Sequence, residues 1–76
     1  MVLAEVFAEV FEEPVESFTD DSNRESVLGW TSMRHVALLV KIENVYGMRF
    51  SNAEMATMRS MGDIRAALSR KGVPVS

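Results

Sequence analysis

Hydrophobic positions recur with a helical period in the first part of the chain. Apolar residues at positions 2, 3, 6, 7, 10 and 11 are spaced three or four apart, which predicts an amphipathic helix in this segment. Pro14 is expected to end this helix, because proline cannot continue the backbone hydrogen-bond ladder. No segment of the chain shows sustained alternation with a period of two, so we expect no β-strands.

The longest apolar run in the chain predicts a central helix over Ser32–Tyr46. Its residues are apolar almost all round, which is typical of a helix surrounded by other elements. Gly47 follows as a stop signal. Beyond it, Met48 and Phe50 are expected to fold back onto the core.

Three short phrases place a serine three residues before an acid, the spacing of a helix start in which the hydroxyl and the carboxylate satisfy each other's backbone donors. They predict a helical turn near 23–28, a short helix near 52–58 and a last helix near 61–70. The phrases are Ser22-Asn23-Arg24-Glu25, Ser51-Asn52-Ala53-Glu54 and Ser60-Met61-Gly62-Asp63.

Residues 14–31 form a long connection with few apolar anchors, and long loops in compact domains are often functional. Trp30 is expected to pack this loop onto the helices. The chain is therefore predicted to be one domain, residues 1–76. Its fold class is predicted to be all-α, a small helical bundle.

Charge is unevenly distributed along the chain. Residues 1–31 carry eight acids and one base, a formal charge of −7, whereas residues 32–76 carry seven bases and three acids, a charge of +4, so that the net charge is −3. An acidic first half argues against a nucleic-acid partner, which requires a clear basic surface. A helical DNA-binding module is accordingly the poorest of the alternatives.

Candidate catalytic and metal-binding groups are sparse. The absence of Cys and the single His, His35, exclude disulfides, a Cys nucleophile and a multi-histidine metal site. Ser32 and His35 lack the strand–turn scaffold of a nucleophile elbow, and Asp20-Asp21 lacks the rest of a calcium loop. We therefore expect no catalytic residue and no metal site, and we interpret His35 as a solvated or packed side chain.

Neither a membrane span nor a secretion signal is expected. No apolar run approaches the roughly 20 residues that a membrane-spanning helix requires. The N-terminal residues include an acid, Glu5, where a secretion signal would have positive charge. We expect a cytoplasmic monomer.

Ser32 is the residue with the clearest candidate chemistry. It stands where the central helix begins, and the free N–H groups and positive dipole end of a helix N-terminus favour a phosphate ester. The simpler interpretation is that Ser32 or Thr31 caps the helix, since both residue types are favoured N-caps. These residues alone leave both interpretations open.

With this layout, the chain resembles the acyl carrier proteins over nearly its whole length. Thr31-Ser32-Met33 stands at the place of the family's Asp-Ser-Leu signature, and Gly29-Trp30 before it is similar to discrete carriers of specialised pathways. The resemblance also covers Val36 and residues 39–42 as core, Glu43-Asn44-Val45-Tyr46-Gly47, and Ser60-Met61-Gly62-Asp63-Ile64 before the last helix.

The resemblance implies an all-α fold, a four-helix bundle of acyl-carrier type with a long loop between helices 1 and 2. It also implies that the protein is not an enzyme. Ser32 would receive 4'-phosphopantetheine from coenzyme A through a phosphopantetheinyl transferase, and the arm would hold acyl groups as thioesters. The implied partners are acyl-transferring or ligase enzymes of a fatty-acid, polyketide or other specialised acyl pathway. The partner-binding residues implied around the arm are Thr31, Met33, Arg34, Leu38 and Lys41.

Two departures from the family pattern affect these expectations. Thr31 replaces the signature Asp, which removes a carboxylate that the transferase is expected to read. Arg34, His35 and Lys41 occupy a helix surface that is usually acidic, so we expect a dedicated set of partners. Two alternatives stay open: an aminoacyl carrier of D-alanyl type, which can also have Ser-Met at the signature, and a degenerate carrier that stays unmodified and binds proteins.

Overall fold

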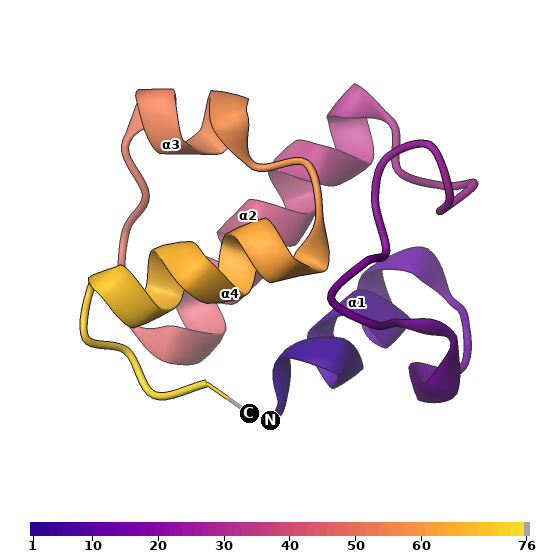
Figure 1. Ribbon diagram of the computed structural model, residues 1–76, viewed down its shortest axis with the longest axis horizontal. Coiled ribbons are helices and arrows are strands. Elements are labelled where there is room, and N and C mark those ends of the chain that lie inside the picture. The colour runs from indigo at the N-terminus through magenta and orange to yellow at the C-terminus, as the bar shows by residue number, and fades with distance from the viewer. Residues whose placement is uncertain (76) are drawn as a thin grey trace.

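The computed structural model describes residues 1–75, and this part of the chain is all-helical (Figure 1). The predicted four-helix fold with a long first loop is confirmed. Ser76, the last residue of the predicted domain, lies outside the described residues. The elements are α1 (Leu3–Phe11), a short 3-10 helix η1 (Val15–Ser17), α2 (Ser32–Tyr46), α3 (Asn52–Thr57) and α4 (Met61–Arg70). Within residues 1–75, no helix is long and apolar enough to cross a membrane.

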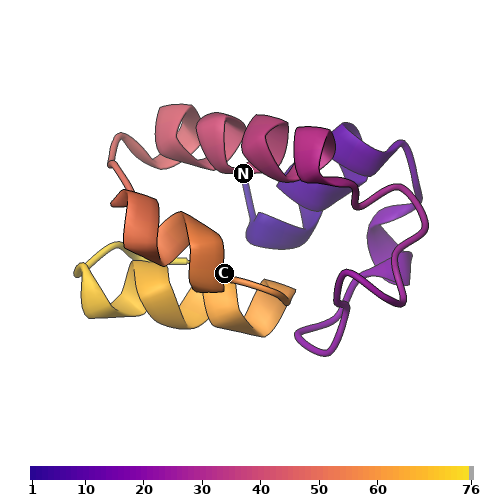
Figure 2. The same ribbon diagram turned by 90° about the horizontal axis from the view of Figure 1, so that it is seen from above.

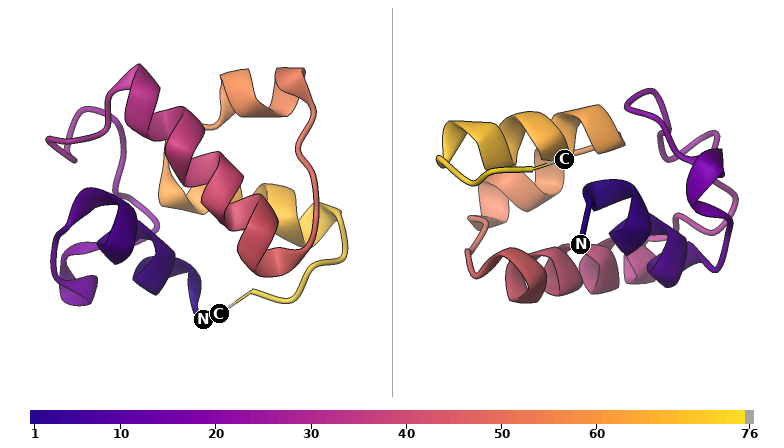
Figure 3. Two further views of the ribbon diagram at one scale, coloured as in Figure 1. Left: turned by 180° about the vertical axis from the view of Figure 1, so that it is seen from behind. Right: turned by 90° about the horizontal axis from the view of Figure 1, so that it is seen from below.

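The helices enclose one hydrophobic core. Figure 2 shows α2 along one side of the molecule and α4 along the opposite side, and α1 lies alongside α2 in both views of Figure 3. Fully burying a Leu, Ile or Phe side chain contributes about 1.5–3 kcal/mol, so the residues at the centre of this core dominate the stability of so small a protein. The largest fully buried side chains are Leu3, Val6, Phe7, Leu38, Leu39, Ile42, Ile64 and Leu68.

The first helix ends before the proline that was expected to stop it. Glu12 adopts a left-handed conformation (φ 56°, ψ 47°), and its N–H donates to the carbonyl of Ala8. The chain has therefore left α1 at Phe11, and Pro14 instead precedes η1 with φ −60°. A left-handed cap ends a helix by itself, whatever residue follows.

The second helix has the bounds that the apolar run predicts. Gly47 ends it in a left-handed conformation (φ 62°, ψ 44°), and the N–H of Gly47 donates to the carbonyl of Glu43. Phe50 folds back into the core as expected and is 6% exposed. The Glu43 carboxylate fixes this return, because Oε2 accepts the N–H of Phe50 at 2.8 Å.

The expected turn near 23–28 is a single hydrogen-bonded turn that does not continue into a helix. The N–H of Val27 donates to the carbonyl of Asn23 at 2.9 Å. The predicted serine cap is wrong, because the Ser22 hydroxyl accepts from the N–H of Thr19 at 2.9 Å. Asn23 takes the cap's place: its Oδ1 accepts the N–H groups of the second and third residues after it at 2.9 and 3.0 Å.

The other two predicted helix starts are confirmed. The Ser51 hydroxyl accepts the N–H of Glu54 at 3.1 Å, and the Glu54 carboxylate accepts the N–H of Ser51 at 2.7 Å, a complete capping box. The backbone N–H of Ser51 and the ammonium group of Lys71 lower the pKa of the Glu54 carboxyl below its ordinary value. At α4 only half of the box forms, because the Ser60 hydroxyl accepts the N–H of Asp63 at 3.0 Å without the return bond.

The first loop is fixed to the start of α4. The N–H of Met61 donates to the carbonyl of Ser22, and the N–H of Gly62 donates to the carbonyl of Asp20, each at 3.0 Å. A Cβ at Gly62 would lie 3.0 Å from the carbonyl oxygen of Asp20, so a side chain there would force the backbone of the loop to move by a few tenths of an ångström. Arg65 adds an ion pair to Asp20 at 2.9 Å. The loop is thereby held against α4.

Candidate functional site

Ser32 is the first residue of α2, and its side chain is exposed. The N-cap is the preceding residue, Thr31, whose hydroxyl accepts the N–H of Arg34 at 3.2 Å and whose carbonyl accepts the N–H of His35 at 2.8 Å. Of the two interpretations of the Thr31-Ser32 pair, capping therefore belongs to Thr31. The Ser32 hydroxyl remains available for other chemistry at the helix N-terminus.

Arg24 is the side chain that the first loop brings to Ser32. Its Nη2 lies 3.4 Å from the Ser32 Oγ, across eight residues of sequence. Sequence reasoning did not assign Arg24 to the site. The one available signal was that Arg24 is the only base among residues 1–31. The Ser32 hydroxyl therefore faces a guanidinium group. The carboxylate that the family signature has next to this serine is absent, because Thr31 stands in its place.

A buried pair of side chains fixes the backbone on either side of Ser32. The Trp30 Nε1–H donates to His35 Nδ1 at 2.9 Å, and His35 Nε2 lies 2.8 Å from the carbonyl oxygen of Met55 in α3. Both bonds form together only with a neutral imidazole that carries its proton on Nε2. Trp30 is 4% exposed and packs edge-on against Phe7, as expected for an anchor of the loop. His35 is 8% exposed, so it is a packed side chain that links α2 to α3, and its expected place on the basic surface of the helix is wrong.

The two bases expected to meet partners, Arg34 and Lys41, both contact α1. The Lys41 Nζ lies 2.9 Å from the Glu9 carboxylate. Arg34 donates to the carbonyl of Val10 at 2.6 Å and lies 3.8 Å from the Glu12 carboxylate. These contacts explain part of the charge asymmetry in the sequence, because acids of the first helix face bases of the second.

For several other residues of α2, the observed burial differs from what the sequence predicted. Leu38 is 0% exposed, so its assignment to a partner-binding surface is wrong: the side chain points into the core between helices. Val36 and Val40 were expected in the core and are 58% and 46% exposed. Met33 is 84% exposed. Met33, Val36 and Val40, at helical spacing, form a surface that we call the outer face of α2.

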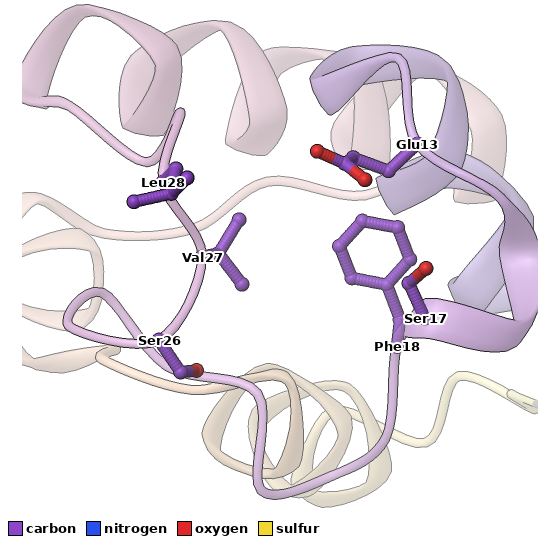
Figure 4. Close-up of a pocket in the computed structure, with 6 residues that line it drawn as sticks. All are labelled: Glu13, Ser17, Phe18, Ser26, Val27 and Leu28. Atoms are coloured by element: carbon purple, nitrogen blue, oxygen red, sulfur yellow. The ribbon is translucent and has the colours of Figure 1, made fainter.

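A small hollow lies in the first loop (Figure 4). Its volume is about 160 Å³, and its wall combines three apolar side chains with two hydroxyls and one carboxylate. The lining residues are Glu13, Ser17, Phe18, Ser26, Val27 and Leu28. Among residues 1–75, no three His, Cys, Asp or Glu side chains lie close enough together to hold a metal ion. The chemistry of the site therefore centres on the Ser32 hydroxyl.

The four-helix fold places an exposed serine at the start of its second helix, next to a first loop that is hydrogen-bonded to the start of α4. Residues 2–68 match the protein family described as "Phosphopantetheine attachment site". The chain is also similar to the holo acyl carrier protein of Geobacter metallireducens, whose solution structure aligns with a TM-score of 0.76 and 26% sequence identity, over 91% of this chain and 84% of that one. No curated protein matches the sequence significantly.

The chain therefore belongs to the acyl carrier protein family, whose members carry covalently attached 4'-phosphopantetheine and are not enzymes. The donors around Ser32 fit a phosphodiester. In the described part of the chain, the N–H groups of Ser32 and Met33 have no acceptor, and the Arg24 guanidinium lies beside the hydroxyl. These residues would hold the phosphate end of the group.

Proposed function

We propose that Ser32 is the attachment residue of 4'-phosphopantetheine and that the loaded protein carries acyl groups as thioesters. The observation that supports this most directly is that the Ser32 hydroxyl is exposed at the first residue of α2 and takes no part in capping. Because Thr31 supplies the cap, Ser32 can be modified without loss of the bond that begins the helix. Similarity to an acyl carrier protein supports an acyl cargo.

Attachment requires a phosphopantetheinyl transferase. Ser32 Oγ forms a bond to the phosphorus of coenzyme A that bears the pantetheine, and the bond from that phosphorus to the bridging oxygen breaks, which releases adenosine 3',5'-bisphosphate. The hydroxyl proton passes to a base of the transferase, and Mg²⁺ held by the transferase neutralises developing charge. When bound, the group supplies a thiol on a flexible arm, and tethering raises its effective concentration at partner active sites.

Partner enzymes are proposed to dock on Thr31 and the outer face of α2. The three residues of that face are exposed and uncharged, so a partner gains by covering them with an apolar surface. Arg34 and Lys41 stay proposed as flanking contacts, because their side chains are still 42% and 35% exposed while paired with α1. An enzyme that recognises an acidic helix would find no acid on this face, which supports a dedicated set of partners.

The cargo is proposed to be an acyl group of a fatty-acid, polyketide or other specialised acyl pathway. An aminoacyl cargo is the other outcome of a loading assay. The loaded protein is incubated with ATP and either a fatty-acyl ligase or an amino-acid ligase, and the thioester product is identified by mass. Loading by the acyl ligase alone is the expected result, whereas loading by the amino-acid ligase alone would contradict the acyl assignment.

Intact-mass measurement tests the attachment residue. The protein is incubated with coenzyme A, Mg²⁺ and a broad-specificity transferase, and we expect a mass gain of one phosphopantetheine. Ser32→Ala should abolish the gain. Ser69→Ala, which removes another exposed serine from a helix, should keep it.

A mass gain that persists in Ser32→Ala would place the group elsewhere and overturn the assignment. No gain with several transferases would point to a carrier that stays unmodified and acts as a protein-binding subunit. Protein purified from its own cells provides the decisive sample, because the native transferase has then acted on it.

A further inference from the structure

Arg24 is a base that the rest of the described chain leaves without an acidic partner. Within residues 1–75, no carboxylate lies within 4.0 Å of its guanidinium, and the side-chain contact that it makes is to the Ser32 Oγ at 3.4 Å. The bases that do form ion pairs are Arg34, Lys41, Arg65 and Lys71. An unpaired guanidinium beside a hydroxyl is positioned for an anion that arrives at that hydroxyl.

The backbone that carries Arg24 is held in place. The N–H of Arg24 donates to the carbonyl of Arg59 at 3.2 Å, and the neighbouring Asn23 forms an isolated β-bridge with Ser60. The carboxamide of Asn23 also closes the turn that follows. The guanidinium therefore approaches the start of α2 from a fixed backbone, which reduces the entropy lost when the side chain binds an anion.

Thr31 leaves this guanidinium available. An Asp at that position would place a carboxylate one residue from Ser32, where it could pair with Arg24 and repel a phosphate. Thr31 is neutral, and its hydroxyl is already used by the N–H of Arg34. The surroundings of Ser32 are therefore cationic, with one guanidinium, two free N–H groups and the positive end of α2.

We propose that Arg24 binds the phosphodiester of the group attached at Ser32, together with the N–H groups of Ser32 and Met33. The ligand class is a singly charged phosphodiester, which a guanidinium fork recognises better than an ammonium group does. Arg24 is thus a positioning residue. It anchors the phosphate end of the arm and offsets the negative charge of the phosphate, whereas an Asp at position 31 would have repelled that charge. This inference rests on Ser32 being the attachment residue.

The test compares the stability of each variant with the attached group (holo) and without it (apo). Any effect of the substitution on the stability of the apo protein then cancels. Urea unfolding is measured for both forms of the wild type, Arg24→Gln, Arg24→Lys and the matched control Arg49→Gln, which removes another exposed arginine without an ion pair. We expect attachment to raise the folding equilibrium constant about two- to fivefold more in the wild type than in Arg24→Gln, the range of an exposed ion pair. Arg24→Lys should keep part of this gain in the folding equilibrium constant, and Arg49→Gln should keep all of it. Addition of 0.5 M NaCl should reduce the gain in the wild type.

Nitrogen-15 NMR of the wild type gives a second measurement that needs no variant. Attachment should shift the Arg24 Nε–Hε resonance and slow its exchange with solvent, with no such change at Arg49. Equal holo-to-apo ratios of the folding equilibrium constant in the wild type and Arg24→Gln would overturn the inference. So would an Arg24 resonance that does not change on attachment. Because these results require loaded protein, they are distinct from failure of Ser32 to accept the group, which would overturn the proposed function first.

Discussion

The inner and outer faces of α2 carry side chains of similar hydrophobicity in opposite environments. Leu38, Leu39 and Ile42 are at most 1% exposed, whereas Met33 and Val36 are mostly exposed. The inner face is covered by the core that it forms with the other helices, and nothing in residues 1–75 covers the outer face to the same degree. Apolar character therefore did not decide which side of this helix is buried; the positions of the neighbouring helices did.

The charged residues around α2 also differ by region: some are paired within the described chain, and one at the N-terminal end of the helix is not. On the α1 side of α2, Lys41 is paired with Glu9 of α1, and Arg34 lies near Glu12, the residue that caps α1, so both bases contribute to holding the two helices together. At the N-terminal end, the base supplied by the first loop is unpaired and contacts Ser32. The bases beside α1 are therefore paired within the described chain, and the guanidinium of Arg24 at the N-terminal end of α2 is not paired with an acid.

The largest expected effect separates the two faces directly. Leu38→Ala should lower the free energy of unfolding by about 2–5 kcal/mol, because it leaves a cavity in the core. Val36→Ala, on the outer face, should change it by no more than about 0.5 kcal/mol. Urea unfolding followed by circular dichroism measures both. Similar losses in the two variants would mean that the outer face is covered in solution.

A smaller effect is expected at the buried bond that fixes the start of α2. Trp30→Phe keeps an aromatic ring but removes the donor to His35 Nδ1, and an unsatisfied buried acceptor costs about 1–3 kcal/mol. Tyr46→Phe is the matched control, because it removes the exposed O–H that donates to the carbonyl of Met1, and it should cost less than about 0.5 kcal/mol. Equal costs for the two variants would contradict a buried Trp30–His35 bond.

The smallest effect concerns the ion pair between α1 and α2. Lys41→Glu and Glu9→Lys each place like charges together, and the double exchange restores an opposite pair. A double-mutant cycle should give a coupling of about 0.2–1 kcal/mol that decreases with added salt. A coupling of zero would indicate that Lys41 is free for partners, as the sequence first suggested.

The limits of α2 and the start of α3 could be predicted from sequence because the signals are local. The capping box at Ser51 and the glycine at position 47 act within a few residues, and both are found where they were expected. Ser32 was selected for the same reason, since a hydroxyl at a helix start has a defined environment. Family resemblance supplied the chemistry that these local signals could not.

Other features depended on which segments meet in space. Arg24 reaches Ser32 because hydrogen bonds to the α3–α4 connection fix the first loop, and no spacing rule links residues 24 and 32. Leu38 was misplaced because a helix that is apolar almost all round gives no periodic signal for its buried side.

The sequence by itself therefore determined the limits of α2, the serine caps of α3 and α4 and the serine that begins α2, because each depends on neighbours along the chain. Only the tertiary structure decided which face of α2 is buried, which bases are paired and which cation faces Ser32. These outcomes depend on contacts between residues far apart in sequence, and burial and ion pairing are properties of such contacts rather than of any single side chain.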